Sequence, residues 1–147
     1  MKFVLPKSLQ TQTIQLNQSA HTAADAAAAL DCDVAQIAKS LIFYDVATNE
    51  PILIIASGAR RVDKVKVGEY LRRKIKTASP EFVLARTGFP AGSVPPFGHL
   101  RKLPTLIDEI LKNFPIVWAA AGSPTSVFSI TPQNLITRTR GQVIPIC

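Results

Sequence analysis

The segment 87–98, TGFPAGSVPPFG, places three glycines and three prolines within twelve residues. Proline fixes the backbone torsion φ and removes a donor, whereas glycine allows positive φ and close approach of another group. We therefore expect a preshaped loop whose free backbone N–H groups can bind a ligand. A second glycine turn is expected at 121–125, AGSPT, after the apolar run 116–120. Two rigid loops of small residues in one small domain predict a pocket built largely from backbone.

Lys39 is the second feature that could do chemistry. It is expected at the end of a short helix over 33–38, immediately before an apolar strand at 41–45. A lysine there either extends its amine to solvent or projects it into a cavity that binds an anionic or carbonyl group. Its position alone favours solvent, so the decision rests on the rest of the chain.

The net charge of +7 is concentrated in one segment, residues 60–76. This segment holds eight Lys and Arg residues and two acids, so it carries +6 of the total. Clustered cations attract polyphosphates through counterion release. From charge alone, a polyphosphate-binding surface and a merely solvated helix face are equally good interpretations of this segment.

Composition limits the remaining possibilities. With 147 residues, 47% of them hydrophobic, the chain is expected to form a single domain over 1–147. It has no apolar run of membrane-spanning length and no leader pattern, so we expect a soluble, cytoplasmic protein without membrane partners. Cys32 and Cys147 lie too far apart in sequence to suggest a disulfide framework. His21 and His99 have no cysteine at ligand spacing, so neither a metal nor another cofactor is expected.

Short helices and strands must position these residues. Thr22 is expected to cap an alanine-rich helix to Leu30, and strands 41–45 and 51–56 to form an antiparallel hairpin. Asp63 is expected to cap a basic helix over 64–71. Short strands interleaved with short helices predict an α+β fold, with a mixed, strongly curved, barrel-like sheet and flanking helices.

The segments IAKSLIF, TGFPAGSVPPFGH, LPTLIDEI and AAGSPTSVFSITPQNL follow one another in a recognisable order. In this order the chain resembles the YbaK/prolyl-tRNA-synthetase-associated (INS-like) family of editing domains, over about residues 13–140. Members hydrolyse wrongly charged aminoacyl-tRNA. The resemblance implies an editing pocket formed by Lys39, Gly92, Pro96, Gly98 and Gly122, with Asp108 matching an acidic residue of the pattern.

The resemblance also suggests roles for these residues. Lys39 would place its charge beside the ester or the terminal phosphate. Backbone N–H groups around Phe97 and Gly98 would hold the acyl carbonyl or the terminal ribose, as preorganised donors do in acyl transfer. The expected catalytic residues are thus Lys39 and Gly98. The pocket would be narrowed for a small amino acid by Val94, Pro95 and Pro96. Ser40 and Ser123 stand where relatives vary, so they bear on which amino acid is removed.

The basic segment would then hold the tRNA acceptor stem, mostly through phosphates. The residues expected to do so are Arg60, Arg61, Lys64, Arg72, Arg73 and Lys74. The expected partners are aminoacyl-tRNA, with a prolyl-tRNA synthetase or an elongation factor as further candidates. The expected activity is trans-editing of tRNA-Pro carrying Ala, Ser, Thr or Cys. A non-catalytic module that binds tRNA or a synthetase is the alternative, and a general nucleic-acid binder is a weaker third because aromatic residues are scarce.

Overall fold

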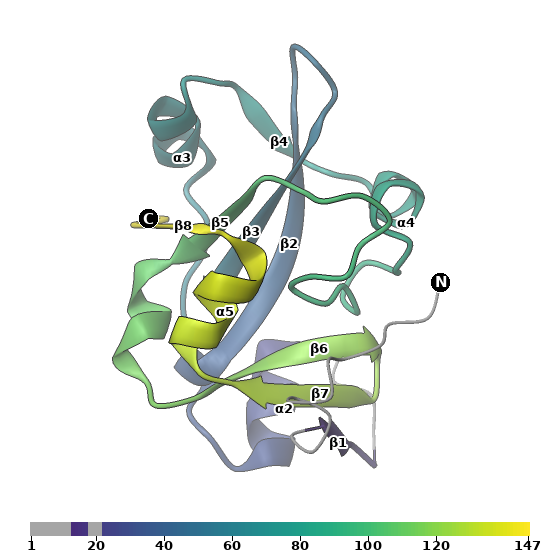
Figure 1. Ribbon diagram of the computed structural model, residues 1–147, viewed down its shortest axis with the longest axis vertical. Coiled ribbons are helices and arrows are strands. Elements are labelled where there is room, and N and C mark those ends of the chain that lie inside the picture. Colours follow the sequence, from purple (N-terminus) through teal and green to yellow (C-terminus); the bar gives the residue numbers. More distant parts are fainter. Residues whose placement is uncertain (1–12, 18–21) are drawn as a thin grey trace.

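The computed structural model describes residues 13–17 and 22–147 (Figure 1). The expected domain over 1–147 therefore includes residues outside the described part, His21 among them. The described helices are α2 (Ala23–Leu30), α3 (Lys64–Leu71), α4 (Pro80–Thr87) and α5 (Pro132–Thr139), with 3-10 helices η1 (Val34–Gln36) and η2 (Glu109–Asn113). The strands are β1 (Thr13–Gln15), β2 (Ile37–Asp45), β3 (Pro51–Ser57), β4 (Ile75–Thr77), β5 (Thr105–Asp108), β6 (Val117–Ser123), β7 (Ser126–Ile130) and β8 (Gln142–Ile144). None of the described helices is long and apolar enough to cross a membrane.

The strands form one mixed sheet in the order β1-β7-β6-β2-β3-β5-β8, with β4 paired to β2 outside this path. The β2–β3, β6–β7, β1–β7 and β2–β4 pairs are antiparallel, whereas β2–β6, β3–β5 and β5–β8 are parallel. The predicted α+β class and the β2–β3 hairpin are confirmed. Barrel-like curvature is not shown, because the strand path of the described residues ends at β1 and at β8 without a pair between them.

The long strand β2 joins two parts of the molecule, as Figure 1 shows. At one end its outer edge pairs with β6 through Ile37 and Ala38, and at the other end the same edge pairs with β4 through 43–45. Between them, residues 39–42 face neither strand. The opposite edge is paired continuously with β3 from Ala38 to Tyr44. This interruption leaves a gap in the sheet next to Lys39.

Side chains alternate across β2, as the pleat requires. Ala38 and Ile42 pack in a cluster with Val94, whereas Phe43 packs on the other face with Ile54. Ser40 shares the parity of Ala38 and Ile42, and Lys39 that of Phe43. The two neighbours therefore leave the strand on opposite faces.

The expectation that Lys39 ends a helix is wrong, because it lies inside β2. The helix signal at Asp33 is real but short: its carboxylate accepts from the Ala35 N–H, and the Gln36 side chain bonds back to the Asp33 N–H. This capping box closes one 3-10 turn, and the strand begins at Ile37. Pairing with β3 and β6 then keeps the chain extended through Lys39.

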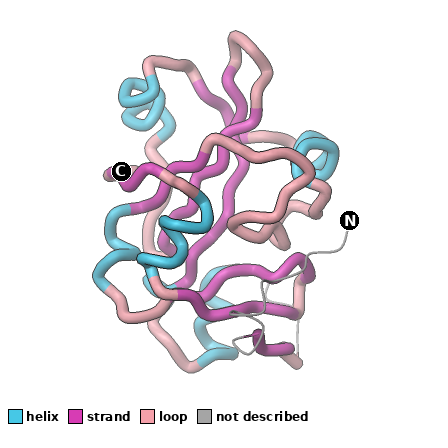
Figure 2. The backbone as a smooth tube through the Cα atoms, viewed as in Figure 1, coloured by secondary structure: helices cyan, strands magenta, loops and turns pink. Residues whose placement is uncertain are grey.

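The local cap signals are otherwise confirmed. The Thr22 hydroxyl accepts the Asp25 N–H at the start of α2, and the Asp63 carboxylate accepts two N–H groups at the start of α3. The segment 88–104, between α4 and β5, has no helix or strand, as the long pink loop in Figure 2 shows. It contains the predicted glycine and proline loop.

Candidate functional site

Two adjoining cavities open beside the gap in β2, with volumes of about 450 Å³ and about 400 Å³. Both volumes lie in the range of ~300–1,000 Å³ that is typical of small-molecule sites. The residues common to the two walls form what we call the seam: Lys39, Ser40, Leu41, Gly92 and Val94. Four of these five were predicted site residues. A ligand that occupies both cavities must therefore pass the middle of β2 and the start of the glycine and proline loop.

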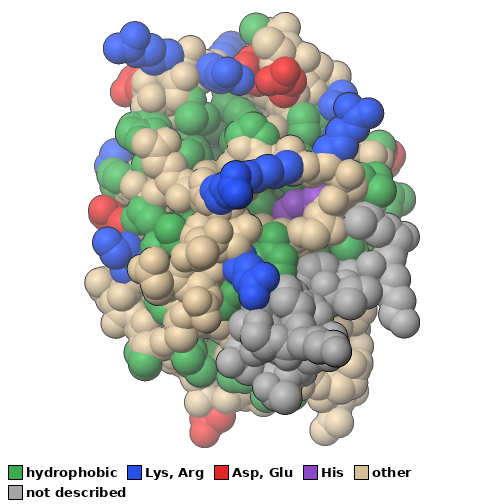
Figure 3. Space-filling model, viewed as in Figure 1, with side chains coloured by type: hydrophobic (Ala, Val, Ile, Leu, Met, Phe, Trp, Pro, Cys, Tyr) green, Lys and Arg blue, Asp and Glu red, His purple; other side chains and the backbone are tan. Residues whose placement is uncertain are grey.

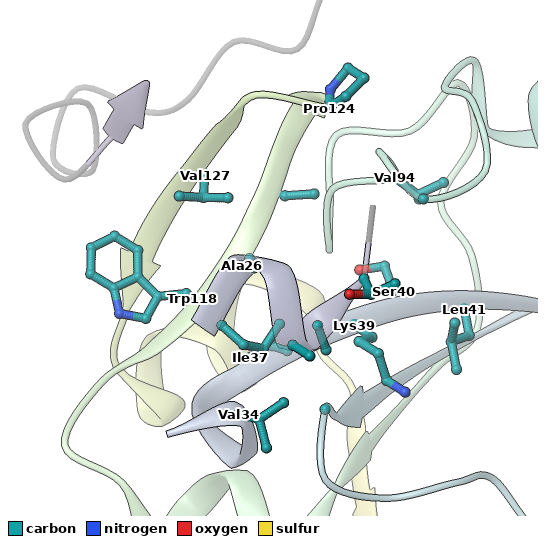
Figure 4. A pocket seen from close by; sticks show the side chains of 18 of the residues that line it. Ala26, Val34, Ile37, Lys39, Ser40, Leu41, Val94, Trp118, Pro124 and Val127 are labelled. Atoms are coloured by element: carbon teal, nitrogen blue, oxygen red, sulfur yellow. The ribbon is translucent and has the colours of Figure 1, made fainter. Parts of the chain in front are cut away.

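The larger cavity is mainly apolar (Figure 4). Beyond the seam its walls come from α2, the start of β2, and the β6–β7 hairpin. Ala38, Ala119 and Ala120 keep the space open because their side chains are only methyl groups, while Trp118 and Val127 line another part of the wall. This cavity suits a small, largely apolar group.

The smaller cavity is also mainly apolar, but its charged lining residues are all basic. Arg61 and Lys64 line it together with Lys39, and the rest of the wall comes from β2, β4, α4 and the loop. Among the described residues, neither cavity is lined by an Asp, Glu or His side chain. Three cations without a lining acid make this cavity attractive to an anionic group such as a phosphate.

Lys39 is half-buried, and its Nζ donates a hydrogen bond to the Arg60 carbonyl oxygen at 3.4 Å. In Figure 4 its side chain leaves β2 away from Val94, whereas the Ser40 side chain lies toward Val94. A single long hydrogen bond leaves the other two protons of the ammonium group free for a ligand. Lys39 thus lines both cavities while its amine is held near the Arg60 carbonyl, on the face of β2 opposite to Ser40.

The glycine and proline loop contributes two seam residues, and two of its prolines are buried beneath it. Gly92 has φ of +87° and is exposed, whereas Val94 is buried. Pro95 and Pro96 are also buried but line neither cavity, so they support the loop from behind. Phe97 packs edge-on against Phe128 in the core, with ring centroids 5.9 Å apart.

The end of the loop is fixed by His99. Its Nε2 lies 2.6 Å from the carbonyl oxygen of Pro95, and burial lowers the pKa of the imidazole. The neutral ring can donate through Nε2–H to this carbonyl. Figure 3 shows a histidine recessed on one face of the molecule. Gly98, with φ of +82°, lies outside the cavity walls, so its N–H would reach a substrate only beyond the space described.

The second glycine turn begins later than expected, because β6 continues through Gly122 to Ser123. Gly122 has φ of +91° at an irregularity in the β6–β7 pairing between Ala120 and Ser123. Ser123 lines the larger cavity, and its hydroxyl lies 2.6 Å from that of Ser126. Gly122 itself, a predicted pocket residue, lines neither cavity.

Asp108 lies away from both cavities. It is fully buried at the end of β5, where one carboxylate oxygen accepts the Ser57 N–H at 3.0 Å and the other accepts the Ile110 N–H at 3.2 Å. The carboxylate thus joins β3 to the start of η2. The structure gives it a supporting position and does not bring it to the seam.

The structure divides the predicted tRNA-binding residues into two groups. Arg61 and Lys64 reach the smaller cavity, and the Arg60 carbonyl holds Lys39. By contrast, Arg72, Arg73 and Lys74 follow the far end of α3, where the Arg73 guanidinium lies 3.2 Å from Asp45 and 3.7 Å from Glu50. Figure 3 shows Lys and Arg side chains spread over this face rather than gathered on one element.

Asp45 explains why Arg73 is held there. The Ala47 N–H donates to this carboxylate at 2.8 Å and, together with Arg73, holds the pKa of Asp45 below its usual range. Arg73 is therefore partly engaged within the protein, and the residues nearest to a bound ligand are those before and at the start of α3.

Sequence reasoning missed the alanine pair at 119–120 and the contribution of α2 to the cavity. The signal was present in the run AAAG at 119–122, because small residues in a strand mark a place where another group approaches closely.

Comparisons with known proteins show the family of the chain. Residues 17–137 match the family model of the aminoacyl-tRNA editing domain. The uncharacterised protein YwhH of Bacillus subtilis (strain 168) is 33% identical over 138 residues, 88% of this chain and 87% of that protein. A proline–tRNA ligase of Limosilactobacillus fermentum is 29% identical over 105 residues, 69% of this chain but only 18% of the ligase.

Among solved structures, a crystal structure of a candidate trans-editing enzyme for prolyl-tRNA synthetase has a TM-score of 0.86 and 39% sequence identity. The match covers 91% of this chain and 84% of that one. The chain therefore belongs to the aminoacyl-tRNA editing domain family, the YbaK/prolyl-tRNA-synthetase-associated group that its motifs resemble.

Proposed function

We propose that this protein is a trans-editing deacylase, which hydrolyses the ester bond of tRNA-Pro charged with a small wrong amino acid. The observation that carries the proposal is the pair of adjoining cavities that share Lys39, Ser40 and Gly92, the smaller of which is also lined by Arg61 and Lys64. The aminoacyl-adenosine end of a tRNA carries two such groups: a small side chain on the acyl group that is esterified to the ribose, and a phosphate on the 5′ side of the same ribose. Family membership and the similarity to part of a proline–tRNA ligase support the choice of substrate.

The larger cavity would take the amino acid. Its alanine walls at 119–120 leave room for a side chain of the size of Ala, Ser, Thr or Cys. Such a second sieve has a physical purpose, because one methylene group changes binding by only about 1–3 kcal/mol in a synthetase pocket. A wrong amino acid that passes the first pocket is then selected by a separate one.

The smaller cavity would take the phosphate of the terminal nucleotide. Lys39, Arg61 and Lys64 face it without a lining acid among the described residues. Charge-assisted hydrogen bonds from these groups would fix the ester at the seam. The remaining basic residues of α3 and its flanks, Lys74 among them, would contact the acceptor stem more loosely.

The reaction adds water across the ester. The bond between the acyl carbon and the ribose oxygen breaks, the amino acid leaves with a free carboxyl group, and the ribose regains its hydroxyl. Negative charge develops on the acyl oxygen, and Lys39 together with the backbone N–H groups of Gly92 and Val94, the loop residues that line both cavities, would stabilise it. Because no carboxylate or imidazole of the described residues lines the cavities, we assign activation of water to the substrate's own ribose hydroxyl.

The test is deacylation of tRNA-Pro mischarged with Ala, Ser, Thr or Cys, with correctly charged prolyl-tRNA as the reference. We expect release of one or two of the small amino acids and little release of proline. Lys39→Ala should lower the rate by at least about 100-fold, the usual effect of removing one charge-stabilising group. Lys112→Ala, an exposed lysine outside both cavities, is the matched control and should leave the rate unchanged.

Two outcomes would contradict the proposal. If no amino acid is released although tRNA still binds, the protein is a binding module rather than a deacylase. If Lys39→Ala and Lys112→Ala hydrolyse at the same rate as the unaltered protein, the reaction takes place elsewhere than at the seam.

A further inference from the structure

Ser40 carries a hydroxyl group without a partner. Its Oγ is buried and makes no hydrogen bond, and it is the one side-chain N or O atom of the described residues in this condition. Buried polar groups are almost always paired, since an unpaired one loses its hydration without compensation. An orphan hydroxyl in the wall shared by two cavities is therefore best explained by a ligand that supplies the missing bond.

The backbone of Ser40 faces the same gap. Along a strand, the N–H and C=O groups of alternate residues point to opposite edges. The Ile37 carbonyl accepts from Gly58 on the β3 side, whereas the Ile42 carbonyl accepts from Ala78 on the β4 side. Ser40 has the parity of Ile42, so its N–H and C=O point to the outer edge, where pairing with β6 ends at Ala38 and pairing with β4 begins at Phe43. Ser40 thus presents one donor and one acceptor of the main chain beside its hydroxyl.

The chemistry of the cavities decides what these groups meet. An aminoacyl ester carries an α-ammonium group, which needs acceptors, yet the described cavity walls contain no carboxylate. Lys39 leaves β2 on the opposite face and offers only donors. At the seam, the Ser40 carbonyl and hydroxyl oxygens are acceptors that no other group of the described structure uses.

We propose that Ser40 recognises the α-ammonium group of the aminoacyl ester, accepting hydrogen bonds through its carbonyl oxygen and Oγ. This inference rests on the proposed function. It assigns to Ser40 the recognition of the α-ammonium group, which does not depend on the amino-acid side chain. Selection among side chains is then left to the volume between Ala119, Ala120 and Val127. A substrate whose α-amino group is missing or acylated loses this recognition whatever its side chain.

The experiment measures binding, so that it does not depend on turnover. The probes are 3′-(L-alanylamino)-3′-deoxyadenosine and the same compound with a propionyl group, which lacks only the amino group. Both contain an amide that resists hydrolysis. Dissociation constants are measured by calorimetry for the unaltered protein, for Ser40→Ala, and for Ser129→Ala, a serine on β7 that lines neither cavity. Thermal unfolding confirms that each variant is folded.

We expect the unaltered protein and Ser129→Ala to prefer the alanyl probe by at least about tenfold. Ser40→Ala should reduce this preference about tenfold and leave the affinity for the propionyl probe unchanged, as loss of one hydrogen bond to a charged group does. An unchanged preference in Ser40→Ala, or no preference in the unaltered protein, would overturn the inference.

Deacylation assays separate this inference from the proposed function. If the unaltered protein hydrolyses mischarged tRNA while Ser40→Ala keeps the full preference for the alanyl probe, only the role of Ser40 fails. If the preference collapses in Ser40→Ala but no tRNA is hydrolysed, the recognition stands and the catalytic step fails.

Discussion

Replacing Asp108 by alanine should destabilise the protein without disabling its site. The family resemblance places Asp108 in the substrate pocket, but the structure buries its carboxylate between the N–H groups of Ser57 and Ile110. The two possible roles of Asp108, binding the substrate and supporting the backbone, predict different results for this variant. The first changes the Michaelis constant, and the second changes the free energy of unfolding.

The expected magnitude follows from what the two N–H groups lose. Ser57 is fully buried, so its N–H would have no water to replace the carboxylate, at a cost of about 1–3 kcal/mol. Ile110 is only half-buried, and its N–H can recruit water at a smaller cost. The expected total is about 2–4 kcal/mol. With an unfolding entropy of about 2.1 cal/mol/K per residue, each kcal/mol lowers the Tm of a chain of 147 residues by about 3 °C.

The assay is thermal unfolding followed by circular dichroism, with deacylation measured well below the transition. We expect Asp108→Ala to lower the Tm by about 6–12 °C and to change KM less than about twofold. Glu109→Ala, the exposed neighbouring acid, is the control and should stay within about 0.5 kcal/mol of the unaltered protein. A Tm within about 2 °C of the unaltered value, together with a large rise in KM, would refute the supporting role and return Asp108 to the substrate.

Three further predictions concern the seam and its loop. Gly58→Ala should lower the free energy of unfolding by about 3 kcal/mol, because the new methyl group would lie 2.5 Å from the Val34 carbonyl oxygen. Gly92→Ala should lower it by only about 1 kcal/mol, because a side chain is strained at φ of +87° but no other atom lies within 4 Å of the new methyl group. Gly92→Ala should nevertheless slow deacylation more than its stability loss explains, which rate measurements on the folded variant would show. Burial lowers the pKa of His99 in the folded state, so the free energy of unfolding should fall as the pH falls below the ordinary histidine value of about 6.5. In unfolding experiments between pH 8 and 5, His99→Gln should remove the part of this pH dependence that comes from His99. Ser40→Ala should raise the free energy of unfolding by about 1 kcal/mol, because it removes a buried hydroxyl without a partner, and it should weaken ligand binding. A clear loss of stability in denaturant titrations would show that Oγ has a partner in the folded protein.

Local features of the fold could be read from the sequence. The caps at Thr22 and Asp63 are confirmed because a cap depends on residues two or three positions apart. The β2–β3 hairpin is confirmed for a similar reason, since its turn and both strands are neighbours in the chain.

Features set by distant pairing could not be read in this way. The residues after Asp33 look helical, which predicts a helix end at Lys39, yet β2 begins at Ile37, which pairs with Trp118, 81 positions further along the sequence. The cavity itself arises from this pairing and from its early end. A local sequence pattern does not predict the residue at which the pairing between two distant strands ends.

Not all residues of the predicted motifs line the two cavities. Lys39, Gly92 and Val94 lie at the seam, but Pro95 and Pro96 of the same loop support it from the core side. A motif records which residues occur together, and residues that hold a loop in shape recur beside those that touch the ligand.

The interrupted edge of β2 has a consequence for solubility and assembly. An unpaired strand edge on a protein surface is a template on which another chain can add a strand, and proteins usually block it with charge, proline or a bulge. Here the stretch without a strand partner spans only 39–42, the Ile42 carbonyl at its end already accepts from the Ala78 N–H, and residues of α2 and of the glycine and proline loop line the adjoining cavity, so little of the edge is left for an added strand. A compact ligand needs less of the edge than a strand does, so main-chain hydrogen-bonding groups can stay open here with little risk of aggregation.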